Sequence, residues 1–555
     1  MYQSVLSGAF RGLDSFLVEV EVDVSDGLPC MEMIGYLANE VKESRDRVRV
    51  GIKNSGYQLP VKRVTISLTP SDIRKDGSGF DLPVAIGILS ACEERGDTGV
   101  IEEDAEKLLS DGEDISDPEE EKNSSEEKSN EDYINNEFRN KTLIIGELGL
   151  DGEVKPVRGV LPMLLMAVKE GVKNCILPKG NMLEAQNVKA IRLFPVQTLR
   201  EAYEIYKSGG SIRRDTSAIE AWGRESMPEK KEEAVPDFAQ ICGQQQAKRA
   251  AEIAAAGFHN LLLFGPPGSG KSMIAERIPT ILPEMTYEEC LEVTQIYSVA
   301  GLLDADTGLI TRRPYERPHH SITPAALTGG GTHPVPGAIT MAHKGVLFLD
   351  ELPEFGREKL DLLRQPLEEK KIRIIRNQYA CDYQCDFMFV AAMNPCPCGF
   401  YPDRRRCNCK ENEVRRYLKR VSGPILDRMD ISVEVGKIEW QQLTGETEQE
   451  SSERIRMRVA EAQRIQIQRQ GKYNSALTGK EIDKAAVMDQ EAMRMLAKVF
   501  ERKQLSIRGY QRIRKLSRTI ADLAGKEIIG RGELAEAVML NQGMEEIHKK
   551  GGGFT

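Results

Sequence analysis

The segment from Gly265 to Ser272 carries the clearest chemical signal in this 555-residue chain. It follows the P-loop pattern of a glycine, four residues and Gly-Lys-Ser, between an apolar strand pattern at 261–264 and a helix pattern that begins at Ser272. Backbone N–H groups of such a loop bind phosphate oxygens, and the helix N-terminus adds partial positive charge. The alternative is a glycine-rich turn without a ligand. We predict an ATP site that comprises Gly265, Pro266, Pro267, Gly268, Ser269, Gly270, Lys271 and Ser272.

Two carboxylates are expected to complete the chemistry of this loop. Asp350 and Glu351 follow the apolar run at 346–349, and ligands of open parallel sheets bind at the carboxyl ends of the strands. Lys271 should reach the β- and γ-phosphates, while the Ser272 hydroxyl and Asp350 hold Mg²⁺. Glu351 would orient or activate the attacking water. Taken alone, two solvated acids at the end of a strand would give the same pattern.

A hairpin and a further strand precede the next polar group, Asn394. The patterns predict strands at 370–376, 381–389 and 387–394, and the Asn394 amide is expected to position water beside the γ-phosphate. A turn asparagine before a proline would look the same. The hairpin carries three basic residues that could contact phosphates, although a simple surface hairpin is equally compatible: Lys371, Arg373 and Arg376.

Longer segments around these motifs resemble one protein family. The matching segments are GPPGSGKS, LFLDELPEF, AAMNPCPCG and SGPILDRMD, with KDGSGFDLPVAIGIL and GELGLDGEVKPVRGVLP nearer the N-terminus. Together they look like the magnesium-chelatase-like AAA+ ATPases of the YifB/ComM type, over nearly the whole chain. The resemblance implies an α/β fold: a P-loop AAA+ domain with a parallel sheet and a helical lid.

The resemblance also implies two arginines that act on ATP, and a ring. Arg428 in LDRMD looks like the arginine finger, which would act on ATP held by a neighbouring subunit. Arg508 in LSIRGYQRI looks like the sensor-2 arginine of the lid. Both would place guanidinium charge against the transferring phosphoryl group. Because a finger acting in trans needs an oligomer and this class is similar to hexameric rings, we expect a homo-hexamer.

The first block resembles the α+β peptidase domain of Lon proteases, a fold of the ribosomal S5 domain 2-like type. Those enzymes use a Ser–Lys dyad whose serine follows a Lys-Asp-Gly segment, here residues 75–77. The nucleophile position then falls on Gly79, with Ser78 one place early, and the lysine position falls on Leu161. Because a serine needs an adjacent base to become a nucleophile, we expect a non-proteolytic domain.

Four cysteines have a spacing that suits a metal. Cys396, Cys398, Cys407 and Cys409 form a C-x-C pair, eight residues and a second C-x-C pair. Four thiolates close in sequence suit tetrahedral zinc, although these gaps are shorter than the usual two to four residues. The alternative is four reduced cysteines, which the polar segment 399–410 would bury poorly. We predict a structural Zn²⁺ site.

The same excursion is the most basic part of the chain. Basic residues with interleaved aromatic residues suit a nucleic-acid backbone, and Tyr401 and Tyr417 could stack on bases. A solvated charged surface is the alternative. The basic residues are Arg404, Arg405, Arg406, Lys410, Arg415, Arg416, Lys419 and Arg420.

The net charge of −10 by itself argues against a protein that binds nucleic acid, but most of this charge comes from one segment. Residues 102–139 hold 16 acids and four bases, so the rest of the chain carries about +2. The acidic tract is too polar to offset its ordering entropy, so we expect a disordered insertion. The predicted organisation is a Lon-like domain at 1–207 with the insertion at about 102–136, a linker at 208–236, an AAA+ core at 237–436 with a cysteine insertion at about 394–412, and a helical lid at 437–555.

The N-terminal sequence lacks the basic and apolar regions of a signal peptide, and no apolar run approaches 18 residues. We therefore expect no membrane association. The 11 cysteines without a secretion signal favour reduced thiols and a cytoplasmic location.

Four functions are compatible with these features. The leading hypothesis is an ATP-driven ring motor on single-stranded or branched DNA, and the resemblance implies a branch-migration helicase of natural transformation or recombination. Its expected partners are DNA, further copies of the chain, and recombination or competence proteins. The alternatives are the motor subunit of a metal chelatase, a Lon-type ATP-dependent protease and a remodelling ATPase that DNA does not stimulate.

Overall fold

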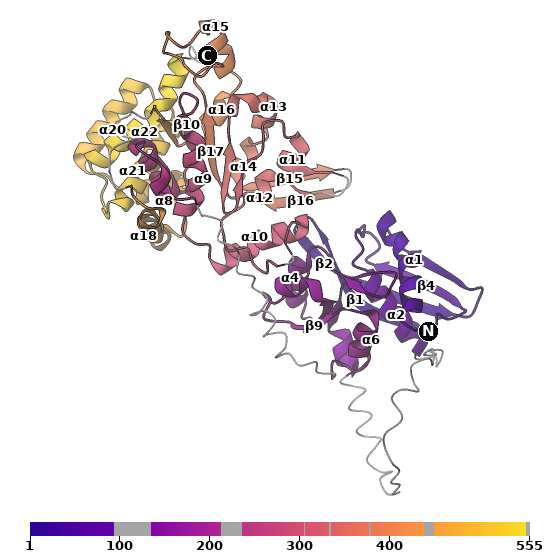
Figure 1. Cartoon of the computed structure of the whole chain (residues 1–555). Helices are drawn as coiled ribbons and strands as arrows, with labels where there is room; N and C mark the ends of the chain where they lie inside the picture. Colours follow the sequence, from indigo (N-terminus) through magenta and orange to yellow (C-terminus); the bar gives the residue numbers. More distant parts are fainter. Residues whose placement is uncertain are drawn as a thin grey trace. The chain divides into compact units, whose positions relative to one another are not determined.

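The computed structural model describes residues 1–93, 135–211, 236–304, 306–331, 335–376, 379–437 and 449–550 (Figure 1). The described residues within 1–230 and 294–310 pack into one unit, and those within 231–293 and 311–555 pack into another. The predicted acidic insertion, except residues 135–136, and most of the predicted linker lie outside the described residues. The predicted domain boundaries therefore stay predictions.

The first unit is an α+β fold around a mixed sheet of seven strands in the order β3-β4-β2-β1-β5-β8-β9. The long hairpin of β1 and β2 is antiparallel, whereas β5, β8 and β9 run parallel to β1. The strands are β1 (Tyr2–Arg11), β2 (Asp14–Ser25), β3 (Cys30–Ile34), β4 (Arg63–Thr69), β5 (Thr142–Ile144), β8 (Asn174–Pro178) and β9 (Arg192–Val196), with a small pair β6 (Glu147–Leu148) and β7 (Val154–Lys155).

One helix of this unit is buried along almost its whole length. Alternate residues of β2 (Val18, Val20, Val22) point into the core, as the period of two requires, and α2 (Asp81–Glu93) packs against them. A Cβ at Gly87 would lie 2.8 Å from the Val22 side chain, so the helix approaches the sheet closely. The other helices are α1 (Asn39–Asn54), α4 (Val160–Lys169), α5 (Met182–Ala185) and α6 (Leu199–Lys207).

The second unit contains a five-stranded parallel sheet in the order β11-β14-β17-β10-β18. Every residue of β10, β14 and β17 is buried, which explains their unbroken apolar runs. The strands are β10 (Leu261–Phe264), β11 (Tyr315–Glu316), β14 (Val346–Leu349), β17 (Met388–Met393) and β18 (Ile431–Glu434). This α/β architecture confirms the predicted fold class.

Helices and short strands connect and cover this sheet. The helix α9 follows the P-loop, and α10 runs from the second unit into residues that group with the first. The helices are α8 (Gln245–Gly257), α9 (Lys271–Ile281), α10 (Tyr287–Ala300), α11 (Pro324–Thr328), α12 (Ala338–Met341), α13 (Gly356–Asp361), α14 (Arg364–Glu369), α15 (Glu411–Leu418) and α16 (Gly423–Leu426), with a strand pair β12 (Gly329–Gly330) and β13 (Val335–Pro336).

The predicted strand at 381–389 is wrong, because two strands divide it. β15 (Lys371–Arg376) pairs with β16 (Tyr379–Gln384) in an antiparallel hairpin, whereas β17 begins at Met388 and joins the parallel sheet. The hairpin extends away from that sheet (Figure 1). Apolar residues on both sides of the break hid it in the sequence.

The C-terminal part is a helical lid, as predicted. Its helices α18 and α21 pack against α8, while α22 packs against β18. Buried polar groups connect the lid internally, since Asp522 accepts hydrogen bonds from Arg469, Arg518 and Asn474. The helices are α18 (Ser452–Gln470), α19 (Gly479–Ala485), α20 (Gln490–Lys503), α21 (Ile507–Leu523) and α22 (Arg531–Lys550).

No helix in the described part of the chain combines the length and apolar character needed to cross a lipid bilayer.

We predict that Asp522→Ala destabilises the lid by about 3–5 kcal/mol, because it leaves the buried Arg518 guanidinium without its carboxylate partner. Asp483→Ala is the matched control. The Asp483 carboxylate also pairs with an arginine of α21, Arg514, but is 67% exposed, so its loss should cost below about 1 kcal/mol. Urea unfolding followed by circular dichroism measures both values. Equal losses would show that the burial of the Asp522 carboxylate does not decide its contribution to stability.

Candidate nucleotide-binding site

The P-loop lies between the end of β10 and the first turn of α9. Gly268 and Gly270 have φ of +72° and +93°, a conformation that side chains other than glycine rarely adopt. A Cβ at either position would meet no atom within 4 Å, so the loop faces open space. With the free N–H groups at the start of α9, this geometry fits a phosphate group.

Lys271 lies with its ammonium group against oxygen atoms of its own loop. Its Nζ donates hydrogen bonds to the carbonyl oxygens of Gly265 (2.9 Å) and Pro266 (2.8 Å), and to Oδ1 of Asn394 (3.2 Å). Burial lowers the pKa of Lys271 to about 8, although the negative charges of Asp350 and Glu351 act to raise it. The structure thus brings the predicted Lys271 and Asn394 together.

Ser272 and Asp350 also meet. The Ser272 hydroxyl, in the first turn of α9, donates a hydrogen bond of 2.8 Å to Oδ2 of Asp350, which directly follows β14. Hydroxyl and carboxylate oxygens are the hard ligands that Mg²⁺ prefers, so the pair fits the ion. When bound, Mg²⁺ would neutralise charge on the phosphates, and these two residues would hold it.

Glu351 occupies the next position with a strained backbone. Its φ of +51° lies in the left-handed region, which is uncommon for a glutamate and typical of functional positions. Its side chain is 55% exposed and approaches the His320 ring at 3.9 Å. The carboxylate is therefore available to accept a proton from water or to orient it.

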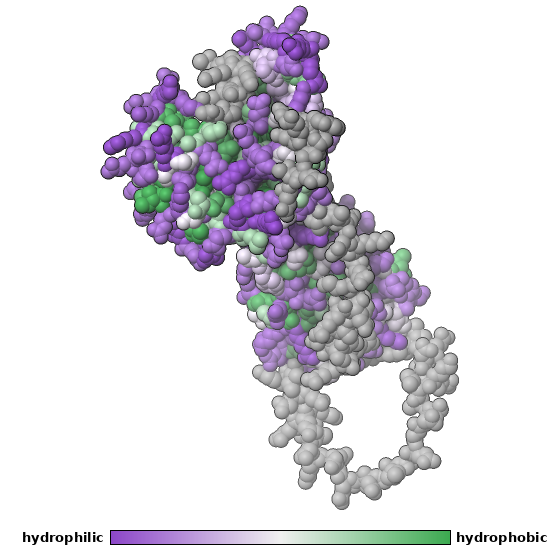
Figure 2. All heavy atoms as spheres, turned by 60° about the vertical axis from the view of Figure 1, so that its left-hand side comes forward, coloured by the Kyte–Doolittle hydropathy of each residue, from purple (hydrophilic) through white to green (hydrophobic). Residues whose placement is uncertain are grey.

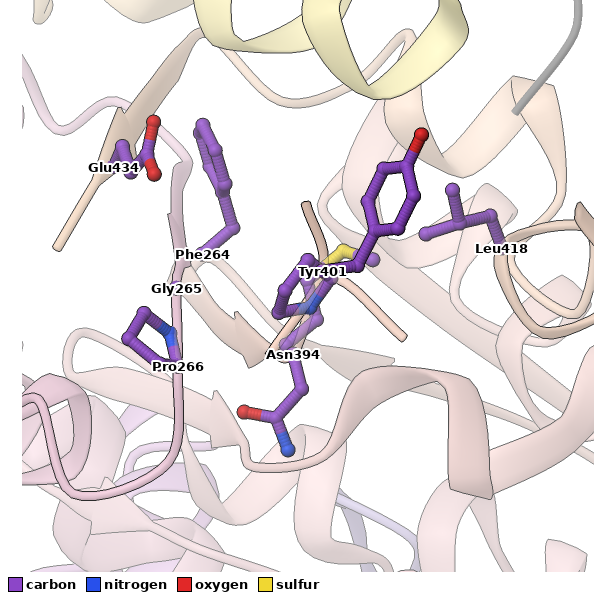
Figure 3. Close-up of a pocket in the computed structure, with 9 residues that line it drawn as sticks. Phe264, Gly265, Pro266, Asn394, Tyr401, Leu418 and Glu434 are labelled. Atoms are coloured by element: carbon purple, nitrogen blue, oxygen red, sulfur yellow. The ribbon is translucent and has the colours of Figure 1, made fainter. Parts of the chain in front are cut away.

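Asn394 forms part of a small cavity beside the P-loop (Figure 3). The Tyr401 ring lies between Asn394 and Leu418, and Phe264 and Pro266 stand on the other side. The loop after β17 thus borders the nucleotide site directly.

The predicted arginine finger and sensor-2 residue share one carboxylate. Arg428 Nη2 lies 2.5 Å and Arg508 Nη2 3.6 Å from Oε1 of Glu368, which is in α14. Glu368 was not among the site residues expected from the sequence. One carboxylate cannot neutralise two guanidinium groups, so this cluster keeps a net positive charge.

The four predicted zinc ligands come together. The sulfur atoms of Cys396, Cys398, Cys407 and Cys409 all lie within 4.8 Å of one another. Cys396 Sγ is 3.4 Å from Cys398 Sγ and 3.8 Å from Cys407 Sγ. A Zn–S distance of about 2.3 Å places tetrahedral ligands about 3.8 Å apart, so the cluster fits zinc.

The Lon-like dyad is not assembled in the first unit. Leu161 is fully buried in α4, and the Ser78 hydroxyl donates to Glu147 instead of facing a lysine. The nearby Lys75 is buried and donates to the Pro70 carbonyl oxygen. This geometry agrees with a non-proteolytic domain.

Arg317 is a site residue that the sequence patterns do not reveal. Its Nη2 donates to Asp350 Oδ2 at 2.9 Å, the same oxygen that Ser272 contacts, and its Nη1 pairs with Glu276 at 2.5 Å. Arg317 directly follows β11, which neighbours β14 in the sheet. Arg317 opens the segment RPHHSITPAALTGGG, which also resembles the family, but a strand of two residues leaves no periodicity that singles out its side chain.

We predict that Glu351→Gln retains ATP binding and slows hydrolysis by about 10²–10⁴-fold, because the amide cannot accept a proton from water. Lys271→Ala serves for comparison and should weaken ATP binding itself, since it removes the cation of the loop. Binding of a fluorescent ATP analogue and phosphate release separate the two effects. Hydrolysis at the wild-type rate by Glu351→Gln would show that another residue activates water.

We also predict that Arg317→Gln lowers the Mg²⁺ concentration needed for half-maximal binding of an ATP analogue by about two- to fivefold. The Arg317 guanidinium places positive charge on the carboxylate that should hold the ion, and a partly exposed pair of this kind contributes below about 1 kcal/mol. Arg317→Lys keeps the charge and should behave like the wild type. A higher Mg²⁺ requirement would mean that Arg317 assists binding.

Comparison with known protein families covers most of the chain. Residues 237–443 match magnesium chelatase, subunit ChlI, and residues 449–541 match its C-terminal family. Residues 20–104 and 130–181 match subunit ChlI of Mg-chelatase. A shorter stretch is similar to the archaeal Lon protease of Thermococcus kodakarensis, with 30% identity over 95 residues, 16% of this chain and 15% of that protein.

Similarity to individual proteins extends over nearly the full length. An uncharacterized protein of Mycobacterium tuberculosis is 38% identical, with 97% of this chain and 98% of that protein covered. Competence protein ComM of Haemophilus influenzae is 38% identical (96% and 96%), and the uncharacterized protein YifB of Escherichia coli is 37% identical (96% and 95%). The family implies ATP and Mg²⁺, which the P-loop geometry fits. The chain therefore belongs to the magnesium-chelatase-like AAA+ ATPases of the ComM and YifB type.

Proposed function

We propose that this ATPase is a hexameric ring motor that moves DNA, and that it acts as a branch-migration helicase in recombination or natural transformation. The observation that carries this proposal is the basic surface beside the nucleotide site. Residues 399–420 contain eight basic and three acidic residues, and all eight basic residues are exposed.

Most of this positive charge has no acidic partner within the described residues. Of the eight basic residues, only two form ion pairs in the described part of the chain: Arg404 with Glu411 (3.8 Å) and Arg420 with Glu354 (2.8 Å). The end of the unit that carries α15 is correspondingly hydrophilic (Figure 2). Arginine and lysine residues without acidic partners attract a phosphate backbone and release its counterions.

The two tyrosines that were expected to stack on nucleic-acid bases are not exposed for this role. Tyr417 is buried, because α15 is amphipathic and packs this ring together with Val414 and Leu418, so Tyr417 is not available to stack on a base. Tyr401 is partly buried in the cavity beside Asn394. Phosphate contacts, not base stacking, therefore favour DNA binding here.

The β15–β16 hairpin offers a second basic surface. Lys371 and Arg373 are exposed on β15, and Arg373 forms an ion pair of 3.5 Å with Asp382 of the facing strand. The side chain of Arg376 lies outside the described residues. Because the hairpin directly precedes β17, which ends at Met393 beside Asn394, a change at the γ-phosphate could move it.

The positions of Arg428 and Arg508 support a ring. Both guanidinium groups pair with Glu368, and in the described part of the chain no hydrogen bond or ion pair joins either of them to the P-loop. Residues that stabilise phosphoryl transfer must reach the phosphates. A neighbouring subunit would supply the nucleotide on which Arg428 acts.

The name of one relative supports a role with DNA. The Haemophilus influenzae relative is called competence protein ComM, and competence denotes the uptake of DNA. The family names instead favour a second candidate, the motor subunit of a metal chelatase. Stimulation of hydrolysis by DNA, or by a tetrapyrrole-binding partner, distinguishes the two.

We predict that single-stranded or branched DNA raises the ATPase rate, and that Arg405→Ala/Arg415→Ala/Arg416→Ala weakens DNA binding without changing the basal rate. Each phosphate contact contributes about 0.7–0.9 to the slope of log K against log salt concentration. Loss of three contacts should therefore reduce the magnitude of this slope by about two to three. Fluorescence anisotropy over a salt series measures it.

The control variant replaces three exposed arginines of the lid helices α18 and α20, Arg454→Ala/Arg464→Ala/Arg494→Ala. It lowers the total charge equally and should leave the slope unchanged. An equal loss in both variants would indicate non-specific attraction. A flat salt response of the wild type would count against DNA as the substrate.

A further inference from the structure

The cysteine cluster belongs to the loop that borders the P-loop. β17 ends at Met393, Asn394 contacts Lys271, and Cys396 follows two residues later. The cluster and the nucleotide site are therefore separated by one residue of backbone, Pro395. Any ion that fixes Cys396 also restricts Asn394.

A second connection runs through Gly399. Its φ is +83°, and a Cβ there would lie 2.5 Å from Cδ of Pro267 in the P-loop. The backbone of the cysteine loop thus packs directly on the phosphate-binding loop, at a distance that only glycine permits. Gly399 lies one residue after Cys398, and its N–H donates to the Cys396 carbonyl oxygen at 2.9 Å.

Tyr401 makes the third connection. Its backbone N–H donates to Cys396 Sγ at 3.4 Å, while its ring borders the cavity that Gly265, Pro266 and Asn394 also line (Figure 3). An N–H donor to a metal-bound sulfur is a typical outer contact of a thiolate site. The same residue therefore contacts both a cysteine ligand and the nucleotide site.

We propose that the four cysteines bind one Zn²⁺ ion, and that this ion holds the loop after β17 against the P-loop, so that zinc occupancy sets the affinity for ATP. The site is structural, because four sulfur ligands complete a tetrahedron and leave no position for a substrate. The inference concerns the nucleotide site and does not depend on whether DNA is the substrate.

The remaining contacts of the loop agree with a fixed geometry. Arg404 Nη1 donates to the Cys409 carbonyl oxygen at 2.9 Å, and the Cys407 N–H donates to the Asp403 carbonyl oxygen at 2.8 Å. Arg406 lies 4.0 Å from the centre of the Phe400 ring. Because the loop has few buried apolar residues besides its cysteines, the metal would supply most of its stability.

The first experiment uses the full-length protein purified under reducing conditions. Metal analysis should find one zinc per chain, and cobalt substitution should give the absorption of a tetrahedral thiolate site. Removing zinc with a zinc-selective chelator, with Mg²⁺ in excess, should weaken binding of a fluorescent ATP analogue about tenfold, and zinc should restore it. Unchanged affinity after zinc removal overturns the proposal, as does a chain that binds no zinc.

The second experiment separates the metal from its effect on the P-loop. Gly399→Ala leaves all four cysteines in place but puts a methyl group against Pro267, so zinc content should stay at one while ATP affinity falls. Cys398→Ser should lower both zinc content and ATP affinity. Cys30→Ser, an exposed cysteine of the first unit, is the control and should change neither.

Two results of this series would contradict the inference. One is a Gly399→Ala variant with wild-type ATP affinity, which would show that the loop contact does not matter. The other is a disulfide among the four cysteines of the purified protein, detected by mass spectrometry without reduction. If Cys398→Ser fails to fold, the ATP affinity of the wild type before and after reversible zinc removal still tests the inference.

Discussion

Three parallel strands that end side by side impose the main constraint on this protein. The sheet order β14-β17-β10 puts the residues that follow these strands at one edge, so that Asp350, Asn394 and the P-loop meet although they are far apart in sequence. The hydrogen bonds from Lys271 to Asn394 and from Ser272 to Asp350 are the direct result. A change in strand order would separate these groups completely.

The same constraint explains where the specialised segments occur. The β15–β16 hairpin precedes β17 and the cysteine loop follows it, so both segments adjoin the strand that leads into Asn394. A displacement of Asn394 would therefore be transmitted to an exposed basic hairpin on one side and to the cysteine loop on the other. In our proposal, this arrangement couples ATP hydrolysis to the movement of DNA.

Residues that belong to continuous motifs could be predicted from the sequence, because their spacing itself encodes the chemistry. The P-loop, the acidic pair after an apolar strand and the four cysteines are of this kind. Arg317 and Glu368 could not be predicted, because each acts through partners distant in sequence: Arg317 follows a strand of two residues, and Glu368 is one of many surface acids.

The fold class was expected from the resemblance to the family, but local breaks between strands could not be predicted. The strands β10, β14 and β17 are unbroken apolar runs, whereas the division between β16 and β17 falls at residues 385–387, where only Asp386 interrupts residues that are compatible with a strand. Burial also decides roles that residue type leaves open. Tyr417 was a candidate for base stacking until the packing of α15 placed it in the interior.

The most direct test of the DNA motor is an assay of branch migration on a mobile DNA junction with the purified full-length protein. We predict that the wild type moves the junction only with hydrolysable ATP, and that Lys271→Ala and Glu351→Gln do not move it. A wild-type protein that hydrolyses ATP normally but moves no DNA substrate would contradict a motor that acts on DNA.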